Sequence, residues 1–192
     1  MDMENIICLN LPVTNSSVVE TLTAGTRVLI NGTIYVGRDA AHKKMTEALD
    51  AGNPLPIDLR NQAIYYMGPT PTPLGKVCGS AGPTSSYRMD AYSPRLMECG
   101  LKVMIGKGRR SQEVIEAMKH FKAVYLVTTG GAAALISKTI VSQEIVAYEE
   151  LGPEALRRLV VKNFPAIVAI DSTGGNLYVT GQEQYRRELN AR

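Results

Sequence analysis

The sequence predicts an α/β fold in which a mixed sheet carries packed helices. β-prone runs and non-helical connections dominate the first third of the chain, whereas strand–loop–helix units with glycine-rich loops dominate residues 77–137. The two patterns together favour a mixed sheet over a purely parallel one. The 192 residues suit one domain over 1–192, with 1–24 as a lead-in and 180–192 as a C-terminal helical extension.

The first third of the chain is expected to be rich in strands. Ile6–Leu11 forms a short apolar strand within the lead-in. Asn31-Gly32 separates two β-prone runs, and this pair predicts a hairpin over residues 27–36. A helix is expected over residues 39–51, because Asp39 is a good N-cap and a glycine follows the last residue.

Strands and helices alternate through the rest of the chain. Strands are expected over residues 63–67, 77–80, 101–105, 123–128, 140–148, 164–170 and 177–179. Helices are expected over residues 88–99, 111–120 and 132–137, with a helical turn at 153–158 and a polar helix in the tail.

Composition and charge exclude several classes of function. No stretch approaches 18 consecutive apolar residues, and the N-terminus lacks a basic segment before its apolar run. The net charge is +3, from 21 Lys and Arg against 18 Asp and Glu. That excess is too small for nucleic-acid binding by bulk electrostatics. The sequence therefore predicts neither a membrane nor a nucleic acid as partner.

Three widely spaced cysteines, Cys8, Cys78 and Cys99, indicate a reducing cytoplasm rather than a disulfide framework. The chain has two histidines and no CxxC motif, and no pair of Cys or His has zinc or iron–sulfur spacing. We therefore expect no metal ligand in this chain. A metal used here takes most of its ligands from another chain.

Three strand-to-helix loops carry candidate ligand-binding side chains. Residues 82–90 combine small residues, the hydroxyl of Thr84 and the guanidinium of Arg88 near a helix start, where free N–H groups attract anions. Lys107 lies between two glycines, and Arg38 immediately precedes a predicted helix. Taken alone, each loop is explained without a ligand, by residues that cap a helix or by basic side chains exposed to solvent. Together, three cations at one end of a sheet suit a small dicarboxylate.

Other small-residue loops have simpler explanations. Residues 128–134 are expected to allow close helix–sheet packing, and Asp171–Gly175 is expected to form a β-turn. His42 has no nearby metal-ligating partner in the sequence and is expected to be structural.

Several ordered runs resemble the β subunit, or C-terminal domain, of class I fumarate hydratases and the related L-tartrate dehydratases. The runs are Gly32–Lys43, Gly82–Asp90, Gly106–Gly108, Glu149–Ala155 and Asn163–Leu177. The resemblance covers residues 27–179. It implies a swivelling β/β/α domain that is active only with an α subunit, a hetero-oligomer in which the α subunit carries a 4Fe–4S cluster. The three cysteines of this chain are then structural.

The resemblance also implies a reaction, the reversible addition of water to the double bond of fumarate to give L-malate. Arg38, Arg88 and Lys107 match the family's substrate-carboxylate ligands. Thr84 matches the residue proposed to remove the carbon-bound proton. The cluster iron, held by the partner, acts as a Lewis acid on the substrate.

The identity of the substrate rests on the residues around Arg88. Met89-Asp90 is similar to the fumarases, whereas Tyr87 stands where the family has a small residue. The nearest alternative is an L-tartrate dehydratase β subunit, which would convert tartrate to oxaloacetate. Two alternatives belong to other classes: a dicarboxylate-binding module without chemistry, and a purely structural subunit.

Overall fold

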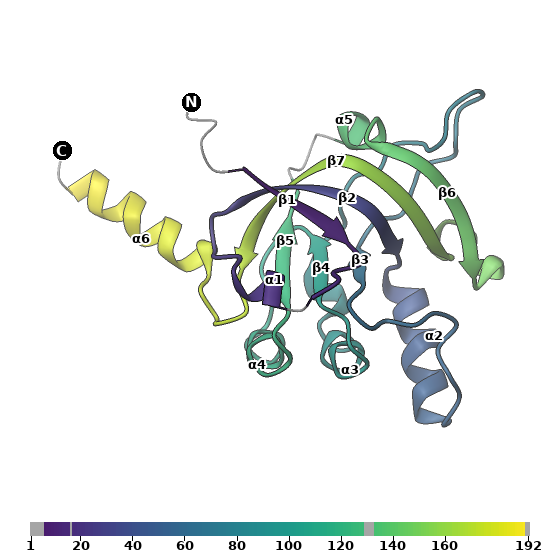
Figure 1. Cartoon of the computed structure of the whole chain (residues 1–192), viewed down its shortest axis with the longest axis horizontal. Coiled ribbons are helices and arrows are strands. Elements are labelled where there is room, and N and C mark those ends of the chain that lie inside the picture. The colour runs from purple at the N-terminus through teal and green to yellow at the C-terminus, as the bar shows by residue number, and fades with distance from the viewer. Residues whose placement is uncertain (1–5, 16, 129–132, 191–192) are drawn as a thin grey trace.

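The computed structural model describes residues 6–15, 17–128 and 133–190 as a mixed α/β fold (Figure 1). Its strands are β1 (Ile6–Leu11), β2 (Arg27–Val36), β3 (Ala63–Tyr65), β4 (Val103–Gly106), β5 (Val124–Val127), β6 (Ile140–Ala147) and β7 (Leu156–Ile170). Its helices are α1 (Ser17–Glu20), α2 (Asp39–Asp50), α3 (Ser93–Glu98), α4 (Gln112–Phe121), α5 (Ala133–Ser137) and α6 (Leu177–Asn190), with 3₁₀ helices η1 (Ser86–Met89) and η2 (Glu149–Glu154). The predicted mixed sheet with packed helices is confirmed.

The sheet contains both parallel and antiparallel pairs. Strands β1 to β5 pair in parallel in the order β1-β2-β3-β4-β5, and β7 pairs antiparallel with β5, β2 and β6. Because β7 bonds to both β5 and β2, the pairing closes a ring through β2, β3, β4, β5 and β7. The 15-residue length of β7 allows this, since it pairs with β2 from Arg157 to Ile167, while its first residues also join β6 and its last residues join β5.

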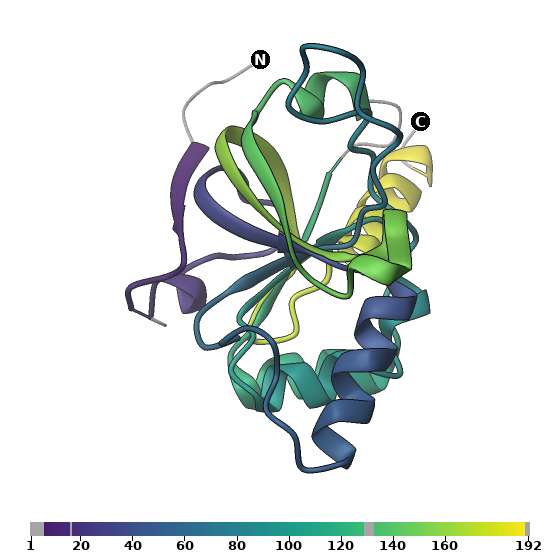
Figure 2. The same cartoon turned by 90° about the vertical axis from the view of Figure 1, so that its right-hand side faces the viewer.

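Two hydrophobic cores divide the molecule into layers. Tyr65 of β3 belongs to the core enclosed by the strands, whereas Ile64 belongs to the core shared with α2, α3 and α4. Met104 and Tyr125 follow the same alternation on β4 and β5, as expected for successive side chains on opposite faces of a strand. Figure 2 shows these helices gathered on one side of the strands.

The hairpin expected at Asn31-Gly32 is wrong, because β2 runs without reversal from Arg27 to Val36. Gly32 has φ +100°, and a Cβ at this position would lie 2.1 Å from the carbonyl oxygen of Leu11. The register against β7 shifts between Ile30 and Gly32. The glycine therefore accommodates the end of β1 and a bulge rather than a turn.

Other expectations differ at single elements. Residues 77–80 form no strand, and the helix expected over 88–99 is divided into η1 and α3. The helical turn expected at 153–158 lies earlier, in η2, and β7 begins eight residues before the expected strand. Residues 177–179 form the first turn of α6 because Asn176 Oδ1 accepts a hydrogen bond from the N–H of Tyr178. The loop expected over 128–134 falls largely on 129–132, outside the described residues.

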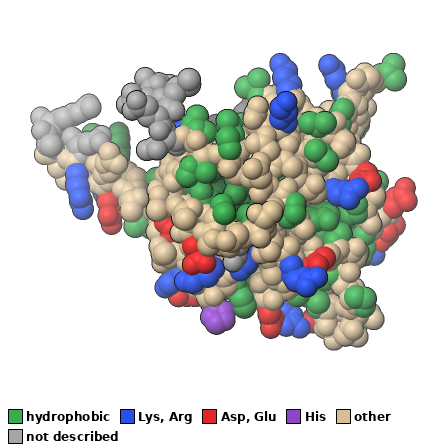
Figure 3. Space-filling model, viewed as in Figure 1, with side chains coloured by type: hydrophobic (Ala, Val, Ile, Leu, Met, Phe, Trp, Pro, Cys, Tyr) green, Lys and Arg blue, Asp and Glu red, His purple; other side chains and the backbone are tan. Residues whose placement is uncertain are grey.

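The surface shows how the remaining elements are exposed. Helix α6 extends away from the body of the molecule (Figure 1). On the face drawn in Figure 3, basic and acidic side chains are mixed along the right and lower edges, whereas the upper edge shows basic ones. No helix in the described part of the chain is long and apolar enough to span a bilayer.

Candidate functional site

The candidate residues gather at the carboxyl ends of β2, β3 and β4. Arg38 lies two residues after β2, and Lys107 directly follows β4. The N–H of Thr84 donates a 2.7 Å hydrogen bond to the carbonyl of Tyr66, just beyond β3, and Arg88 lies four residues further along, in η1. Carboxyl ends of parallel strands meet at one edge of a sheet, where ligands commonly bind.

Backbone contacts join the loop of Thr84 to the turn of Lys107. The N–H of Ser86 donates to the carbonyl of Lys107 at 2.9 Å, and the N–H of Lys107 donates to Ser86 Oγ at 3.1 Å. A Cβ at Gly106 would lie 2.0 Å from Ser86 Oγ, so a glycine is needed for this approach. These contacts fix the two loops relative to each other.

Both candidate arginines contact carboxylates near the start of α2. Arg88 Nε donates a 2.8 Å hydrogen bond to Asp39 Oδ1, and Arg38 Nε lies 2.8 Å from Glu154 Oε1. A Cβ at Gly68 would lie 2.7 Å from the Cζ atom of Arg38, so this glycine makes room for the guanidinium. The first residues of α2 therefore bring Arg38 and Arg88 to one place.

Lys107 and Thr84 have no such partners. Lys107 is exposed and forms no ion pair with another described residue. Thr84 is half-buried, and within the described ranges its hydroxyl has no hydrogen-bond partner. An ammonium and a hydroxyl are therefore available to a bound molecule. The four side chains form no hydrogen bond or ion pair with one another in the described part of the chain.

Arg110 supports this edge from inside the protein, although basic residues in a loop of this kind are expected to be solvated. Its side chain is fully buried, with Nε donating to Asp90 Oδ1 at 2.6 Å and Nη2 donating to Ser93 Oγ at 2.7 Å. Its guanidinium lies 5.4 Å and 5.0 Å from the ring centres of Tyr66 and Tyr125. Arg110 thus links the segment after Arg88 to the turn that carries Lys107.

Tyr125 extends this buried network to the two loops. Its hydroxyl oxygen lies 2.8 Å from Ser86 Oγ and 3.0 Å from the carbonyl oxygen of Gly108, and its single proton is shared between these two acceptors. Burial raises the pKa of the phenol, so it remains a neutral donor. The signals that could have indicated the network are a tyrosine inside an apolar strand and the carboxylate of Asp90 two residues after Arg88.

His42 lies beneath Arg38 in the helix-side core. It is fully buried, its Nδ1 is 3.0 Å from the carbonyl of Arg38, and its ring packs edge-on against Tyr66. Burial lowers the pKa of His42 to about 4, although the hydrogen bond to Arg38 acts in the opposite direction. The neutral ring therefore serves as a donor to the backbone of Arg38.

The residues of this chain do not fit a 4Fe–4S cluster. Cys8 is exposed on β1, Cys78 is buried in the loop after β3, and Cys99 ends α3. Burial raises the pKa of the Cys78 and Cys99 thiols, which disfavours the thiolates that ligate iron. Across the described ranges, no three His, Cys, Asp or Glu side chains group to hold a metal ion.

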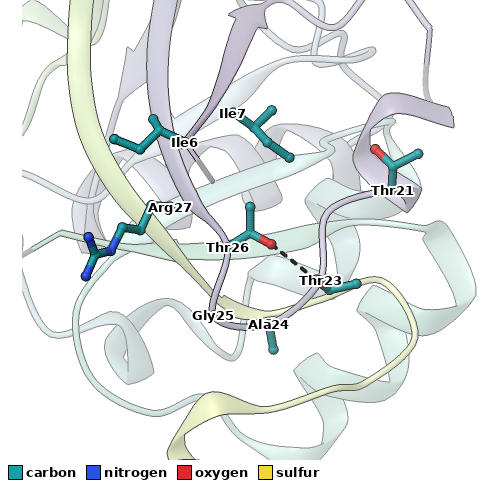
Figure 4. A pocket seen from close by; sticks show the side chains of 8 residues that line it. All are labelled: Ile6, Ile7, Thr21, Thr23, Ala24, Gly25, Thr26 and Arg27. Atoms are coloured by element: carbon teal, nitrogen blue, oxygen red, sulfur yellow. Dashed lines mark hydrogen bonds between the residues drawn. The ribbon is translucent and has the colours of Figure 1, made fainter. Parts of the chain in front are cut away.

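A hollow of about 470 Å³ lies at the opposite edge of the sheet (Figure 4). It is lined by residues at the amino ends of β1 and β2, including Ile6 and Arg27, and the hydroxyls of Thr23 and Thr26 are hydrogen-bonded beside it. The length of β2 separates this hollow from Arg38. It is therefore not part of the candidate site.

The sequence matches the family described as "Fumarase C-terminus" over residues 2–181. The chain belongs to this family. The resemblance predicted from the sequence is thus confirmed, and the match includes Arg38, Thr84, Arg88 and Lys107.

Its relatives in the fumarase family differ in length. This fumarase C-terminus chain is 44% identical over 155 residues to the aerobic class I fumarate hydratase of Escherichia coli K12, covering 80% of this chain and 28% of that protein. It is 42% identical over 156 residues to fumarate hydratase 2 of Leishmania major, with the same coverage. It is 36% identical over 178 residues to the putative L(+)-tartrate dehydratase subunit beta of Methanocaldococcus jannaschii, covering 90% and 91% of the two chains. The chain therefore spans about a quarter of the fumarate hydratases but nearly all of the β subunit.

Proposed function

We propose that this chain is the β subunit of a two-subunit cytoplasmic hydro-lyase that interconverts fumarate and L-malate. The fumarate hydratases it resembles contain a further 72% of sequence, and the relative of its own length is a β subunit. In this proposal, a separate α subunit carries the 4Fe–4S cluster. The closing of this chain over that subunit, as a swivelling domain, would exclude bulk water from the substrate.

The observation that carries this proposal is that three cationic side chains and Thr84 gather at one edge of the sheet. Fumarate and L-malate each have two carboxylates. The guanidinium groups of Arg38 and Arg88 suit planar, two-bond recognition of a carboxylate, and Lys107 supplies a compact charge. Asp39 and Glu154 offset part of this positive charge, so binding of two carboxylates relies on Lys107 and on the guanidinium N–H groups that have no partner among the described residues.

In the proposed reaction, this chain helps to remove one carbon-bound proton and stabilises the negative charge that develops on the neighbouring carboxylate. In the dehydration direction, a C–H proton leaves the carbon next to one carboxylate, and hydroxide leaves the neighbouring carbon as the double bond forms. Loss of the proton places negative charge on the adjacent carboxylate, which nearby cations stabilise. Thr84 is proposed to lie at this carbon. Because a threonine hydroxyl is a weak base, a group of the α subunit must accept its proton in turn.

Tartrate is the second candidate substrate, since the relative of matching length carries that name. The same cations would bind its two carboxylates. Met89 is buried in the helix-side core, and Asp90 forms an ion pair with Arg110. The two residues whose sequence favours fumarate, Met89 and Asp90, therefore do not line the site directly. Tyr87 is exposed, so its ring does not fill a space within this chain.

Anaerobic assays of the assembled two-chain protein test the proposal. We expect L-malate to yield fumarate, and we expect Arg38→Ala and Arg88→Ala to raise KM and lower kcat/KM. Turnover of tartrate alone would retain the site but replace the substrate. Wild-type activity in both arginine variants would instead identify a purely structural subunit. Tight succinate binding by this chain alone, without turnover in the assembled protein, would identify a binding module.

A further inference from the structure

We propose that Glu154 and Asp39 are positioning residues for the two substrate-binding arginines. Each carboxylate holds the Nε side of one guanidinium, Arg38 or Arg88, and leaves the terminal Nη nitrogens for a substrate carboxylate. This inference rests on the proposed function, because it assigns a role to residues behind the same site.

Glu154 makes two contacts at the start of α2. Its Oε1 forms an ion pair with Arg38 Nε at 2.8 Å, without the alignment of a hydrogen bond, and its Oε2 accepts a 3.2 Å hydrogen bond from the N–H of Ala40. The N-cap of α2 is Arg38, which provides no capping side chain. Glu154 therefore caps the helix from η2 and, with its other oxygen, contacts the arginine that precedes the helix.

Asp39 makes the corresponding contact with Arg88. As the first residue of α2, it accepts a 2.8 Å hydrogen bond from Arg88 Nε. The contact uses Oδ1 alone, and Oδ2 is buried without a hydrogen-bond partner among the described residues. The pair joins η1, which carries Arg88, to the helix that follows Arg38.

The contacts with Glu154 and Asp39 both leave the terminal Nη nitrogens of the arginine without a partner among the described residues. Neither Nη nitrogen of Arg38 or Arg88 donates a hydrogen bond to another residue in the described ranges. Two parallel N–H groups on the Nη1–Nη2 edge match the two oxygens of a carboxylate. An arginine held at Nε loses less side-chain freedom when it binds, because part of that freedom is already lost.

This role accounts for the run Glu149–Ala155, which the resemblance includes without a function. The run also supplies a matched control, since Glu150 forms an ion pair from the same turn to Lys44, further along α2. Substituting Glu150 disturbs the packing of η2 on α2 without touching either arginine.

The test compares Glu154→Gln with Glu150→Gln in the assembled protein, with L-malate as substrate. Glutamine keeps an oxygen for Ala40 but loses the charge that faces Arg38. We expect Glu154→Gln to raise KM about 10- to 100-fold with a smaller change in kcat, and Asp39→Asn to behave similarly. Glu150→Gln should leave KM unchanged. In an Arg38→Lys background, the effect of Glu154→Gln should disappear, because Glu154 acts through Arg38.

Several results would overturn the inference. A KM that is unchanged or lower in Glu154→Gln would mean that the carboxylate is idle or competes with substrate. An equal rise in Glu150→Gln would assign the effect to packing of η2. If the wild type turns over neither L-malate nor tartrate, the proposed function fails. Calorimetric binding of succinate to the wild type and the two variants then tests the positioning role separately. Weaker succinate binding in Glu154→Gln alone supports the positioning role, and equal or absent binding in all three proteins refutes it.

Discussion

Thr84 has a fixed backbone and a free side chain. Its N–H is bonded to the carbonyl of Tyr66, whereas its hydroxyl has no partner among the described residues. We expect Thr84→Ala to lower kcat for L-malate about 10²- to 10⁴-fold in the assembled protein, with KM little changed. Thr84→Ser should retain most activity, and Thr180→Ala on the exposed α6 should be neutral. Near-normal turnover in Thr84→Ala would contradict this role.

Arg110 is a fully buried charge whose partner is the carboxylate of Asp90. Its replacement by methionine keeps the volume but leaves the carboxylate of Asp90 without its charged partner. We expect a loss of about 3–5 kcal/mol in the free energy of unfolding, measured by urea denaturation. The exposed pair of Arg60 and Asp58 provides a control, since Arg60→Met should change stability little. Equal effects in the two variants would contradict the buried network.

His42 makes stability depend on pH. Its pKa falls from 6.5 to about 4 on folding, so between these values the unfolded chain binds the proton more tightly. The stabilisation is therefore complete above pH 6.5 and is lost as pH falls toward 4, to a total of about 3 kcal/mol. In urea titrations, His42→Gln should flatten the dependence over this window, and the exposed His120→Gln should not. An unchanged slope in His42→Gln would show that another group is responsible.

At the scale of single elements, Gly106 allows β4 to end against the neighbouring loop. A Cβ there would lie 2.0 Å from Ser86 Oγ and 3.0 Å from Tyr66 Cδ2. We expect Gly106→Ala to cost about 1–3 kcal/mol of stability and to lower kcat/KM, because it separates the turn of Lys107 from its partner loop. Gly181→Ala, with nothing near its Cβ in α6, should stabilise the helix by about 0.5–1 kcal/mol. Similar melting temperatures for the two variants would refute this interpretation.

Local signals predicted the elements that depend on local contacts. The N-cap of α4 is Ser111, whose Oγ accepts from the N–H of Val114, and the strand Ile6–Leu11 has the expected bounds. The hairpin failed because pairing with β1 and β7 outweighed the preference of Asn31-Gly32 for a turn. Such long-range pairing has no local signature in the sequence.

The site shows the same division. Arg38, Thr84, Arg88 and Lys107 could be selected from short runs of sequence. Their supporting contacts could not, because Ala40 and Glu154 are 114 residues apart, and Arg88 and Asp39 are 49 apart. The burial of Arg110 likewise depends on rings contributed by β5 and the end of β3.

On the scale of the whole molecule, the ends of the domain are tied to each other. Asp171 accepts hydrogen bonds from the N–H groups of Ala24, Thr173 and Gly175, so the expected turn also anchors the lead-in. Burial acts to raise the pKa of Asp171, but these hydrogen bonds outweigh it and hold the pKa below its usual value. This tie steadies the edge opposite the candidate site.

In the proposed enzyme, this chain supplies half of the active site. The most direct measurement is an anaerobic assay of fumarate formation from L-malate, with each chain alone and with both after the cluster has been rebuilt. The account predicts turnover only when both chains are present, and its loss when Arg38 and Arg88 are both replaced by alanine. Equal turnover by the cluster-bearing chain alone would contradict it, because this chain would then contribute nothing to substrate binding or chemistry.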